Sequence, residues 1–181
     1  RSWSLEALVT CPASKDSNGE LVPACKGCYA TTGMYHMPNV KKPRQDNKED
    51  WQRDNWVSDM VDELDTDRYF RWFDSGDIQD LDMANNILDI CEQTPHCKHW
   101  IPTKEYKDWK TILRSRSLPS NVALRFSTPM NDTPPLENAP LTTTVFTTVG
   151  SLGMRGFICE ASQKDKYECG DCRACWDTNI N

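Results

Sequence analysis

The hydrophobic residues of this chain alternate between strand-like runs and helix-like stripes. Short apolar runs predict strands at residues 4–10, 69–73, 98–101, 122–126 and 143–149. Stripes at helical spacing between these runs predict helices around residues 56–64, 84–91 and 106–113. This order predicts an α/β fold with parallel strands joined by crossovers. Periodicity alone leaves two architectures open, an open doubly wound sheet and a partial (β/α) barrel.

Local signals refine this pattern. Asn47 and Asp80 are the expected N-caps of the first and second helices. A proline-rich stretch at residues 129–140 lies where a further helix is expected, so the last units should be irregular. Apolar residues then become sparse while cysteines become dense. We therefore expect a barrel domain at residues 1–156 and a Cys-rich, metal-binding tail at residues 157–181 that packs on it.

Composition narrows the functional classes. The formal net charge of −6 over 181 residues argues against a large non-specific DNA-binding surface, which needs a basic patch. The basic cluster at residues 41–44 is interpreted as a solvated loop in preference to a basic pocket. No apolar run is long enough to span a membrane. We expect a cytoplasmic protein without a membrane partner.

The nine cysteines carry the strongest chemical signal, since an odd number without a secretory segment indicates metal binding or catalysis rather than disulfides. Cys11, Cys25 and Cys28 form a C-x13-C-x2-C pattern. Three thiolates without an evident fourth ligand predict an iron–sulfur cluster with one iron open to a substrate or cofactor. The alternative is a structural zinc site that His36 completes.

The second set of cysteines lies in the tail, and its four members can close the coordination of one centre. Its last three residues resemble the opening of a ferredoxin-type run, yet zinc also binds four cysteines, so both metals remain open. Cys91 and Cys97 are expected to pack in the core instead. The tail set is Cys159, Cys169, Cys172 and Cys175.

Several polar residues follow predicted strands, where ligands bind in parallel α/β proteins. This position makes them candidate cofactor-binding residues, and the alternative for the two aspartates is a tight turn before the helix cap. The candidates are Asp74, Gly76, Asp77, Ser127 and Thr128.

The motifs of residues 10–12, 28–30, 71–77 and 169–176 together resemble the phage gene product 88 family, which is similar to radical S-adenosylmethionine (SAM) enzymes. The resemblance implies a partial (β/α) barrel with a four-iron (4Fe-4S) cluster on Cys11, Cys25 and Cys28. SAM would chelate the open iron, and one electron would cleave it to methionine and a 5′-deoxyadenosyl radical. The usual radical SAM motif is C-x3-C-x2-C, and the longer first gap here fits a loop insertion, which costs little free energy.

The same resemblance assigns further roles. The Gly76-Asp77 step matches the place where such enzymes hold the SAM amine, while Ser127 or Thr128 would lie near its carboxylate or ribose. The tail cysteines would hold an auxiliary cluster, and ferredoxin or flavodoxin would donate electrons in the host cytoplasm. The substrate classes left open are nucleic acid, nucleotide and host protein. The rival hypothesis is a non-catalytic iron–sulfur or zinc protein.

Overall fold

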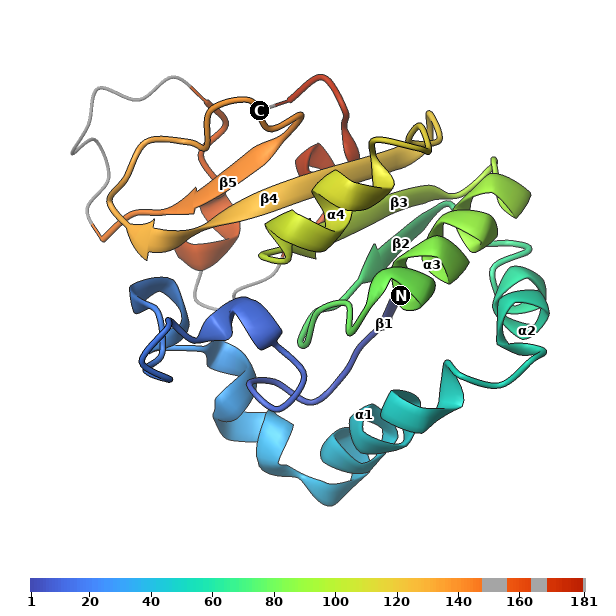
Figure 1. The fold of residues 1–181 in the computed structure, drawn as a ribbon, viewed down its shortest axis with the longest axis horizontal. Coiled ribbons are helices and arrows are strands. Elements are labelled where there is room, and N and C mark those ends of the chain that lie inside the picture. Colours follow the sequence, from blue (N-terminus) through green and yellow to red (C-terminus); the bar gives the residue numbers. More distant parts are fainter. Residues whose placement is uncertain (148–155, 164–168, 181) are drawn as a thin grey trace.

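A five-stranded parallel sheet organises the computed structural model, which describes residues 1–147, 156–163 and 169–180. The strands lie in sequential order, and neighbouring strands are hydrogen-bonded throughout (Figure 1). Their bounds are Ser2–Trp3 (β1), Tyr69–Trp72 (β2), Lys98–Thr103 (β3), Val122–Asn131 (β4) and Thr142–Val145 (β5).

The sequential strand order distinguishes the two expected architectures. A doubly wound sheet reverses its strand order at a switch point, whereas a barrel adds each strand beside the preceding one. The order β1-β2-β3-β4-β5 is that of a barrel, and β1 and β5 are the two edges of an open sheet. The predicted α/β fold with a partial barrel is therefore confirmed.

Four α-helices accompany the strands within the described residues. Asp80 begins α3 as predicted, because its Oδ1 accepts a hydrogen bond of 2.8 Å from the amide of Met83. In Figure 1, α3 and α4 cover one face of the sheet. The helices are Pro38–Asp50 (α1), Trp56–Glu63 (α2), Leu81–Gln93 (α3) and Tyr106–Ile112 (α4).

Short 3-10 helices complete the described structure. Four of them precede α1, in the segment that holds the first three cysteines, and two belong to the tail. They are Pro12–Ser14 (η1), Pro23–Cys25 (η2), Tyr29–Thr31 (η3), Gly33–His36 (η4), Glu160–Gln163 (η5) and Ala174–Trp176 (η6).

The N-terminal prediction of a strand at residues 4–10 is wrong. Strand β1 ends at Trp3, and the following chain turns at Leu8, whose φ of +63° is incompatible with a strand. The amide of Thr10 closes this turn on the carbonyl of Glu6 at 3.1 Å. The apolar residues of this segment therefore belong to a turn and not to a hydrogen-bonded strand.

The region between this turn and α2 also differs from expectation. Asn47 does not cap a helix but lies within α1, where its side-chain amide donates to the carbonyl of Ser4 at 2.9 Å. The basic residues 41–44 belong to the same helix and not to a loop. Helix α1 has no buried residue, so no apolar stripe signals it in the sequence. Pro38 at its first turn favours its start.

Two strand predictions need new bounds. Strand β4 runs to Asn131 and not to residue 126, with a register irregularity between Ser127 and Asn131. Strand β5 spans Thr142–Val145, and residues 148–149 of its predicted range lie outside the described residues. The described part of the chain contains no helix with the length and apolar character needed to cross a membrane.

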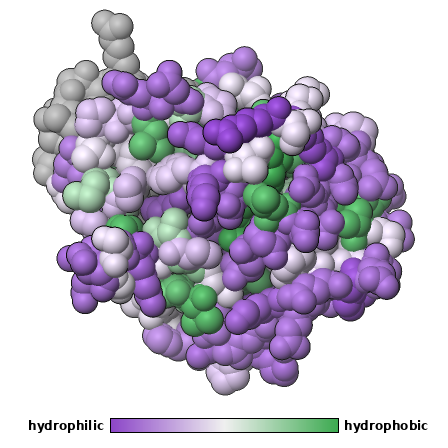
Figure 2. Space-filling view, viewed as in Figure 1, coloured by the Kyte–Doolittle hydropathy of each residue, from purple (hydrophilic) through white to green (hydrophobic). Residues whose placement is uncertain are grey.

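The core lies between the sheet and the helices and is rich in tryptophan. Trp3, Trp56 and Trp72 pack against one another with ring centroids 5.4–6.1 Å apart. Cys91 and Cys97 are buried in the core cluster, as predicted. Figure 2 shows a mostly hydrophilic surface on the viewed face, with separated hydrophobic patches. The apolar residues of the helices are thus used for packing.

One buried polar chain crosses this core. The indole N–H of Trp72 donates to Nδ1 of His99 at 3.2 Å, which assigns the ring proton to Nε2. Nε2 donates to Oγ1 of Thr94 at 2.9 Å, because that hydroxyl itself donates to the carbonyl of Ile90. Burial lowers the pKa of His99 to about 4, so the folded protein holds a neutral imidazole.

This histidine predicts a loss of stability in mild acid. The unfolded chain protonates His99 near its ordinary pKa of about 6.5, whereas the folded chain does not until about 4. The contribution of His99 to the free energy of unfolding should therefore fall between these values, by up to about 1.4 kcal/mol per pH unit, whereas Asp77, whose pKa burial raises to about 7, contributes a change of opposite sign. Urea denaturation at pH 7.5 and pH 5 measures the net change. His99→Gln should remove the part of the change that the histidine contributes, and the exposed-site control His96→Gln should keep it; an equal change in both variants contradicts the prediction.

Candidate functional site

The first three cysteines lie together on the short helices that follow β1. Cys11 precedes η1, Cys25 ends η2 and Cys28 precedes η3, and each side chain is half-buried. The amide of Cys28 donates to the carbonyl of Cys25 at 3.3 Å, so the C-x2-C pair sits on one tight turn. Because η2 packs against β4, this turn lies against the sheet. Cys25 and Cys28 therefore share one turn, and the charge of Cys28 affects both Cys11 and Cys25.

The electrostatics of these thiols reflect their grouping. Burial raises the pKa of Cys11 to about 11, with smaller contributions from the charges of Asp77 and Cys28. Burial also raises the pKa of Cys25, while the charge of Lys104 acts in the opposite direction. The thiols are therefore protonated at neutral pH unless a bound cation stabilises the thiolates.

The described residues do not form a site for a single metal ion. No three His, Cys, Asp or Glu side chains among them converge closely enough to hold one. His36, the alternative zinc ligand, is exposed on η4 and is not among the groups whose charge affects Cys11 or Cys25.

Gly76 fixes the position of Cys11 relative to the sheet. Its φ is +83°, and a Cβ on this residue would lie 2.5 Å from Cβ of Leu5 and 2.9 Å from Oγ1 of Thr10. The amide of Asp77 donates to the carbonyl of Thr10 at 2.9 Å, which draws the residue before Cys11 onto the end of β2. The close backbone approach expected at Gly76 therefore occurs, and its partner is the chain's own loop.

Asp77 is buried behind this loop. Its Oδ1 accepts hydrogen bonds from the hydroxyl of Thr103 (2.8 Å) and the amide of Ile78 (2.9 Å), and its Oδ2 accepts one from the amide of Lys104 (2.8 Å). Burial raises the pKa of Asp77 to about 7 despite these donors. The carboxylate thus joins the ends of β2 and β3, and its charge affects Cys11 and Cys25.

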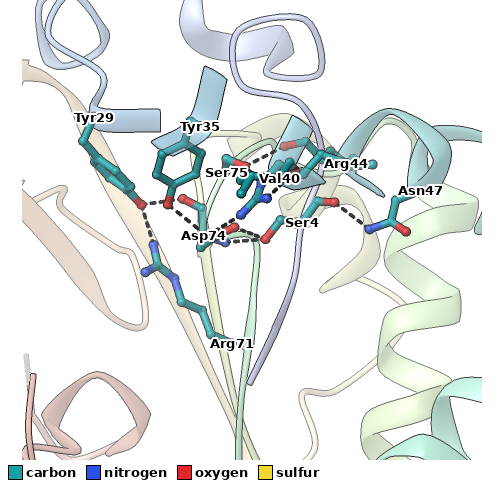
Figure 3. Close-up of polar contacts among 10 residues, drawn as sticks. Ser4, Tyr29, Tyr35, Val40, Arg44, Asn47, Arg71, Asp74 and Ser75 are labelled. Atoms are coloured by element: carbon teal, nitrogen blue, oxygen red, sulfur yellow. Dashed lines mark hydrogen bonds and ion pairs between the residues drawn. The ribbon is translucent and has the colours of Figure 1, made fainter. Parts of the chain in front are cut away.

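Asp74 is the centre of a second polar network (Figure 3). Its carboxylate accepts hydrogen bonds from Ser4 and Tyr35 and forms an ion pair of 2.9 Å with Arg44. Its carbonyl accepts a hydrogen bond from the hydroxyl of Tyr29, the residue after Cys28. Burial alone would raise the pKa of Asp74, but the donor hydroxyls and the charge of Arg44 hold it below its ordinary value.

This network gives Asp74 a positioning role. It connects the segment after Cys28 and helix α1 to the end of β2, so that the cysteine loop has a fixed support. Sequence reasoning missed Arg44 as a partner, because the cluster 41–44 has the composition of a solvated segment. The only available signal was its charge opposite to that of Asp74.

Ser127 and Thr128 do not form a common site. Both lie within β4, and successive residues of a strand point to opposite faces of the sheet. Oγ of Ser127 shares a hydrogen bond of 2.9 Å with Oγ1 of Thr143, whereas Oγ1 of Thr128 donates to the carbonyl of Met130 at 3.1 Å. The expectation that both residues follow a strand is wrong because β4 is longer than predicted.

The tail cysteines lie near the face of the sheet that is opposite α3 and α4. Cys159, Cys169 and Cys172 are exposed and Cys175 is half-buried. Burial raises the pKa of Cys175, and the charges of Arg125, Cys159 and Cys169 also affect it. The amide of Cys172 donates to the carbonyl of Cys169 at 3.1 Å. The described tail residues therefore bring at least three of the four predicted ligands into electrostatic contact.

A comparison with protein families gives one match. The model of the family described as gene product 88 matches residues 2–178, which is nearly the whole chain. No curated protein and no solved structure gives a significant match.

The close contact at Gly76 predicts a large effect of a single methyl group. Gly76→Ala should lower the free energy of unfolding by about 1–3 kcal/mol, because the new Cβ overlaps Leu5 on a backbone with positive φ. Gly27→Ala is the matched control, since its added Cβ meets open space beside Cys28. Urea denaturation of the metal-free variants measures both effects. A Gly76→Ala protein as stable as the control would show that the loop does not depend on this contact.

Proposed function

The chain belongs to the gene product 88 family, and on this premise we propose that it is an iron–sulfur enzyme of the radical SAM type. The observation that supports this proposal is that Cys11, Cys25 and Cys28 lie near enough for their charges to interact, beside the carboxyl end of β2. Active sites of parallel α/β barrels lie at this end of the strands.

The donor set fits a four-iron cluster. Three thiolates would bind three irons and leave the fourth iron open for the amino and carboxylate groups of SAM. When bound, such a cluster would pass one electron from an external reductant to SAM, which would break a carbon–sulfur bond and yield methionine and a 5′-deoxyadenosyl radical. The raised pKa values of Cys11 and Cys25 keep these two thiols protonated in the metal-free protein, so cluster assembly would release protons and be favoured at higher pH.

Neighbouring residues would support the cluster and SAM. Lys104 lowers the pKa of Cys25 and thus stabilises its thiolate. Oδ2 of Asp77 has one protein donor among the described residues, the amide of Lys104, and a carboxylate oxygen can accept a second hydrogen bond. We assign this remaining acceptor position to the SAM ammonium, in keeping with the place of the Gly76-Asp77 step. Either Ser127 or Thr128, which lie on opposite faces of β4, would be near the SAM carboxylate or ribose.

The tail set of four cysteines would hold a second, coordinatively complete centre, with iron–sulfur and zinc as the two candidates. A reductant such as ferredoxin or flavodoxin would supply the electron in the host cytoplasm. The substrate belongs to one of three classes, nucleic acid, nucleotide or host protein.

A non-catalytic iron–sulfur or zinc protein is the second candidate function. One observation favours it: three hydrogen bonds from the chain itself already hold the carboxylate of Asp77. The two candidates differ in whether SAM reacts at the first three cysteines.

Iron analysis provides the first test of the proposal. After anaerobic reconstitution, Cys28→Ala should lose about one cluster's worth of iron and sulfide, because the remaining two thiolates cannot hold a cluster on their own. Cys91→Ala removes a core thiol instead and should keep the iron content of the unmodified protein. A colourless reconstituted protein that contains stoichiometric zinc would contradict the proposal.

SAM cleavage provides the second test. Reconstituted protein given SAM and dithionite should form 5′-deoxyadenosine. Asp77→Asn should weaken SAM binding about ten- to a hundredfold through loss of a charge-assisted hydrogen bond, with unchanged iron content. Asp80→Asn is the matched control, since asparagine is an equally good N-cap. An iron-loaded protein that forms no 5′-deoxyadenosine supports the non-catalytic candidate.

A further inference from the structure

A cavity of about 380 Å³ lies between the starts of β2 and β3 and the C-terminal segment. Tyr69 and Lys98, the first residues of these two strands, are paired in register and line the cavity from the sheet. Residues of the segment 172–180 line it from the other side. The carboxyl ends of the strands, where Asp77 and the cysteine loop lie, are at the opposite edge of the sheet. The cavity is therefore separate from the site described above.

Three aromatic side chains line this cavity. Tyr69 and Trp176 are half-buried and pack edge-on, with ring centroids 5.8 Å apart. The indole N–H of Trp176 donates to the carbonyl of Phe70 at 2.8 Å, which fixes the orientation of this ring. Phe157 is 54 % exposed and presents its ring to solvent. The cavity thus combines two rings that the protein holds in place with a third at its rim.

The cavity also carries positive charge, although the whole chain has a net charge of −6. Lys98 is exposed and, among the described residues, forms no ion pair. The guanidinium of Arg173 lies over the ring of Tyr69, 5.2 Å from its centroid. Nη1 of this arginine donates to the carbonyls of Gly170 and Cys172 at 2.7 and 2.8 Å. A guanidinium oriented in this way keeps its other N–H donors for an anion.

Asp177 is the carboxylate that lines the same cavity. Its Oδ1 accepts hydrogen bonds from the backbone and side-chain amides of Asn179 at 2.9 and 3.0 Å, and these bonds hold its pKa below the ordinary value. The charge of Lys98 also acts on Asp177, but the two groups are not in ion-pair contact. Two cations and one carboxylate leave the cavity with a net positive charge, which favours an anionic ligand.

We propose that this cavity binds a single-stranded nucleic acid, with one base inside the cavity and the next base stacked on Phe157. Two successive phosphates would then lie at Lys98 and Arg173. Aromatic faces combined with cations are the recognition chemistry of single strands, because every base has a planar face and every nucleotide carries a negative charge. The volume of about 380 Å³ is within the range of pockets for groups of this size, roughly 300–1,000 Å³.

Other anionic ligands match the cavity less well. The bases of a duplex are stacked on one another and cannot enter it, and a long duplex would meet the acidic remainder of the protein. An acidic peptide would satisfy the two cations but would leave the aromatic rings without a planar partner. The inference adds a ligand to the protein and does not rest on iron–sulfur or SAM chemistry.

Fluorescence anisotropy with a labelled oligothymidylate of about ten nucleotides tests the proposal on the full chain under reducing conditions. The logarithm of the association constant should fall with the logarithm of the salt concentration with a slope of about −1.4, because each of two phosphate contacts contributes about −0.7. A duplex of the same length should bind at least about tenfold more weakly. Absence of binding at low salt, or equal binding of the duplex, overturns the proposal.

Variants of the charged residues test the position of the phosphates. Lys98→Gln should weaken binding about tenfold and make the salt slope less steep by about 0.7, because one phosphate contact is lost. Lys110→Gln removes an exposed charge from α4 and is the matched control. Asp177→Asn should strengthen binding severalfold, since asparagine can still accept the bonds from Asn179. If Lys98→Gln behaves like Lys110→Gln, or if Asp177→Asn weakens binding, the proposal fails.

A variant of the exposed ring tests the stacking contact. Phe157→Ala should weaken binding about five- to a hundredfold and leave the salt slope unchanged, because stacking releases no counter-ions. Ile158→Ala is the matched control, since this neighbouring side chain is 57 % exposed. Both side chains are at the surface, so neither change should affect folding. Equal affinities of the two variants contradict the stacking contact and with it the proposal.

Competition experiments identify the occupant. Thymidine 5′-monophosphate offers one base and one phosphate and should compete at least about tenfold less well than the oligothymidylate. An oligoglutamate peptide of similar charge should not compete. A mononucleotide or a peptide that competes as well as the strand overturns the assignment to single-stranded nucleic acid. These measurements need neither a cluster nor SAM, so the proposal and the proposed function can fail independently.

Discussion

The structure depends on the crossing of the N-terminal loop over the Gly76-Asp77 step. The amide of Leu5 donates to the carbonyl of Ser75 at 3.0 Å, and the amide of Asp77 donates to the carbonyl of Thr10. These two backbone hydrogen bonds hold the loop against Gly76, at a point where a side chain would not fit. The first cysteine follows directly, so its position beside the sheet is determined by main-chain contacts. Any residue except proline can form the contact at position 5, and any residue can form the one at position 10. Gly76, in contrast, has no space for a side chain.

Charge is distributed unevenly over this acidic protein. Carboxylates are plentiful on the surface, where they pair with exposed arginines, and such pairs contribute little to stability. By contrast, Lys104, Arg71 and Arg125 have charges that affect buried or half-buried thiols. Burial raises the pKa of Cys25 and Cys175, and these three cations oppose that effect.

Sequence patterns predicted the elements that bury an apolar stripe and failed where polar contacts decide the structure. Helix α3 combines a buried face with the Asp80 cap, so both of its signals agree. Helix α1 buries no residue and is held by side chains such as Asn47 and Arg44, whose partners lie far away in the sequence. The turn that joins Cys25 and Cys28 was predictable from the C-x2-C spacing. The pairing of Asp74 with Arg44 was not, since no local pattern reports a contact across thirty positions.

Both cysteine segments are attached to the sheet rather than to each other. The hydroxyl of Tyr29, next to Cys28, accepts a hydrogen bond from Arg71 of β2, and the indole of Trp176, next to Cys175, donates to the carbonyl of Phe70 on the same strand. Neighbouring residues of β2 thus hold the two segments. Because a strand paired on both sides is among the least mobile parts of a domain, the relative position of the two cysteine segments follows from the sheet. The loops that carry the cysteines can then be polar and irregular. Their position is fixed by these contacts with the sheet and not by a hydrophobic core of their own.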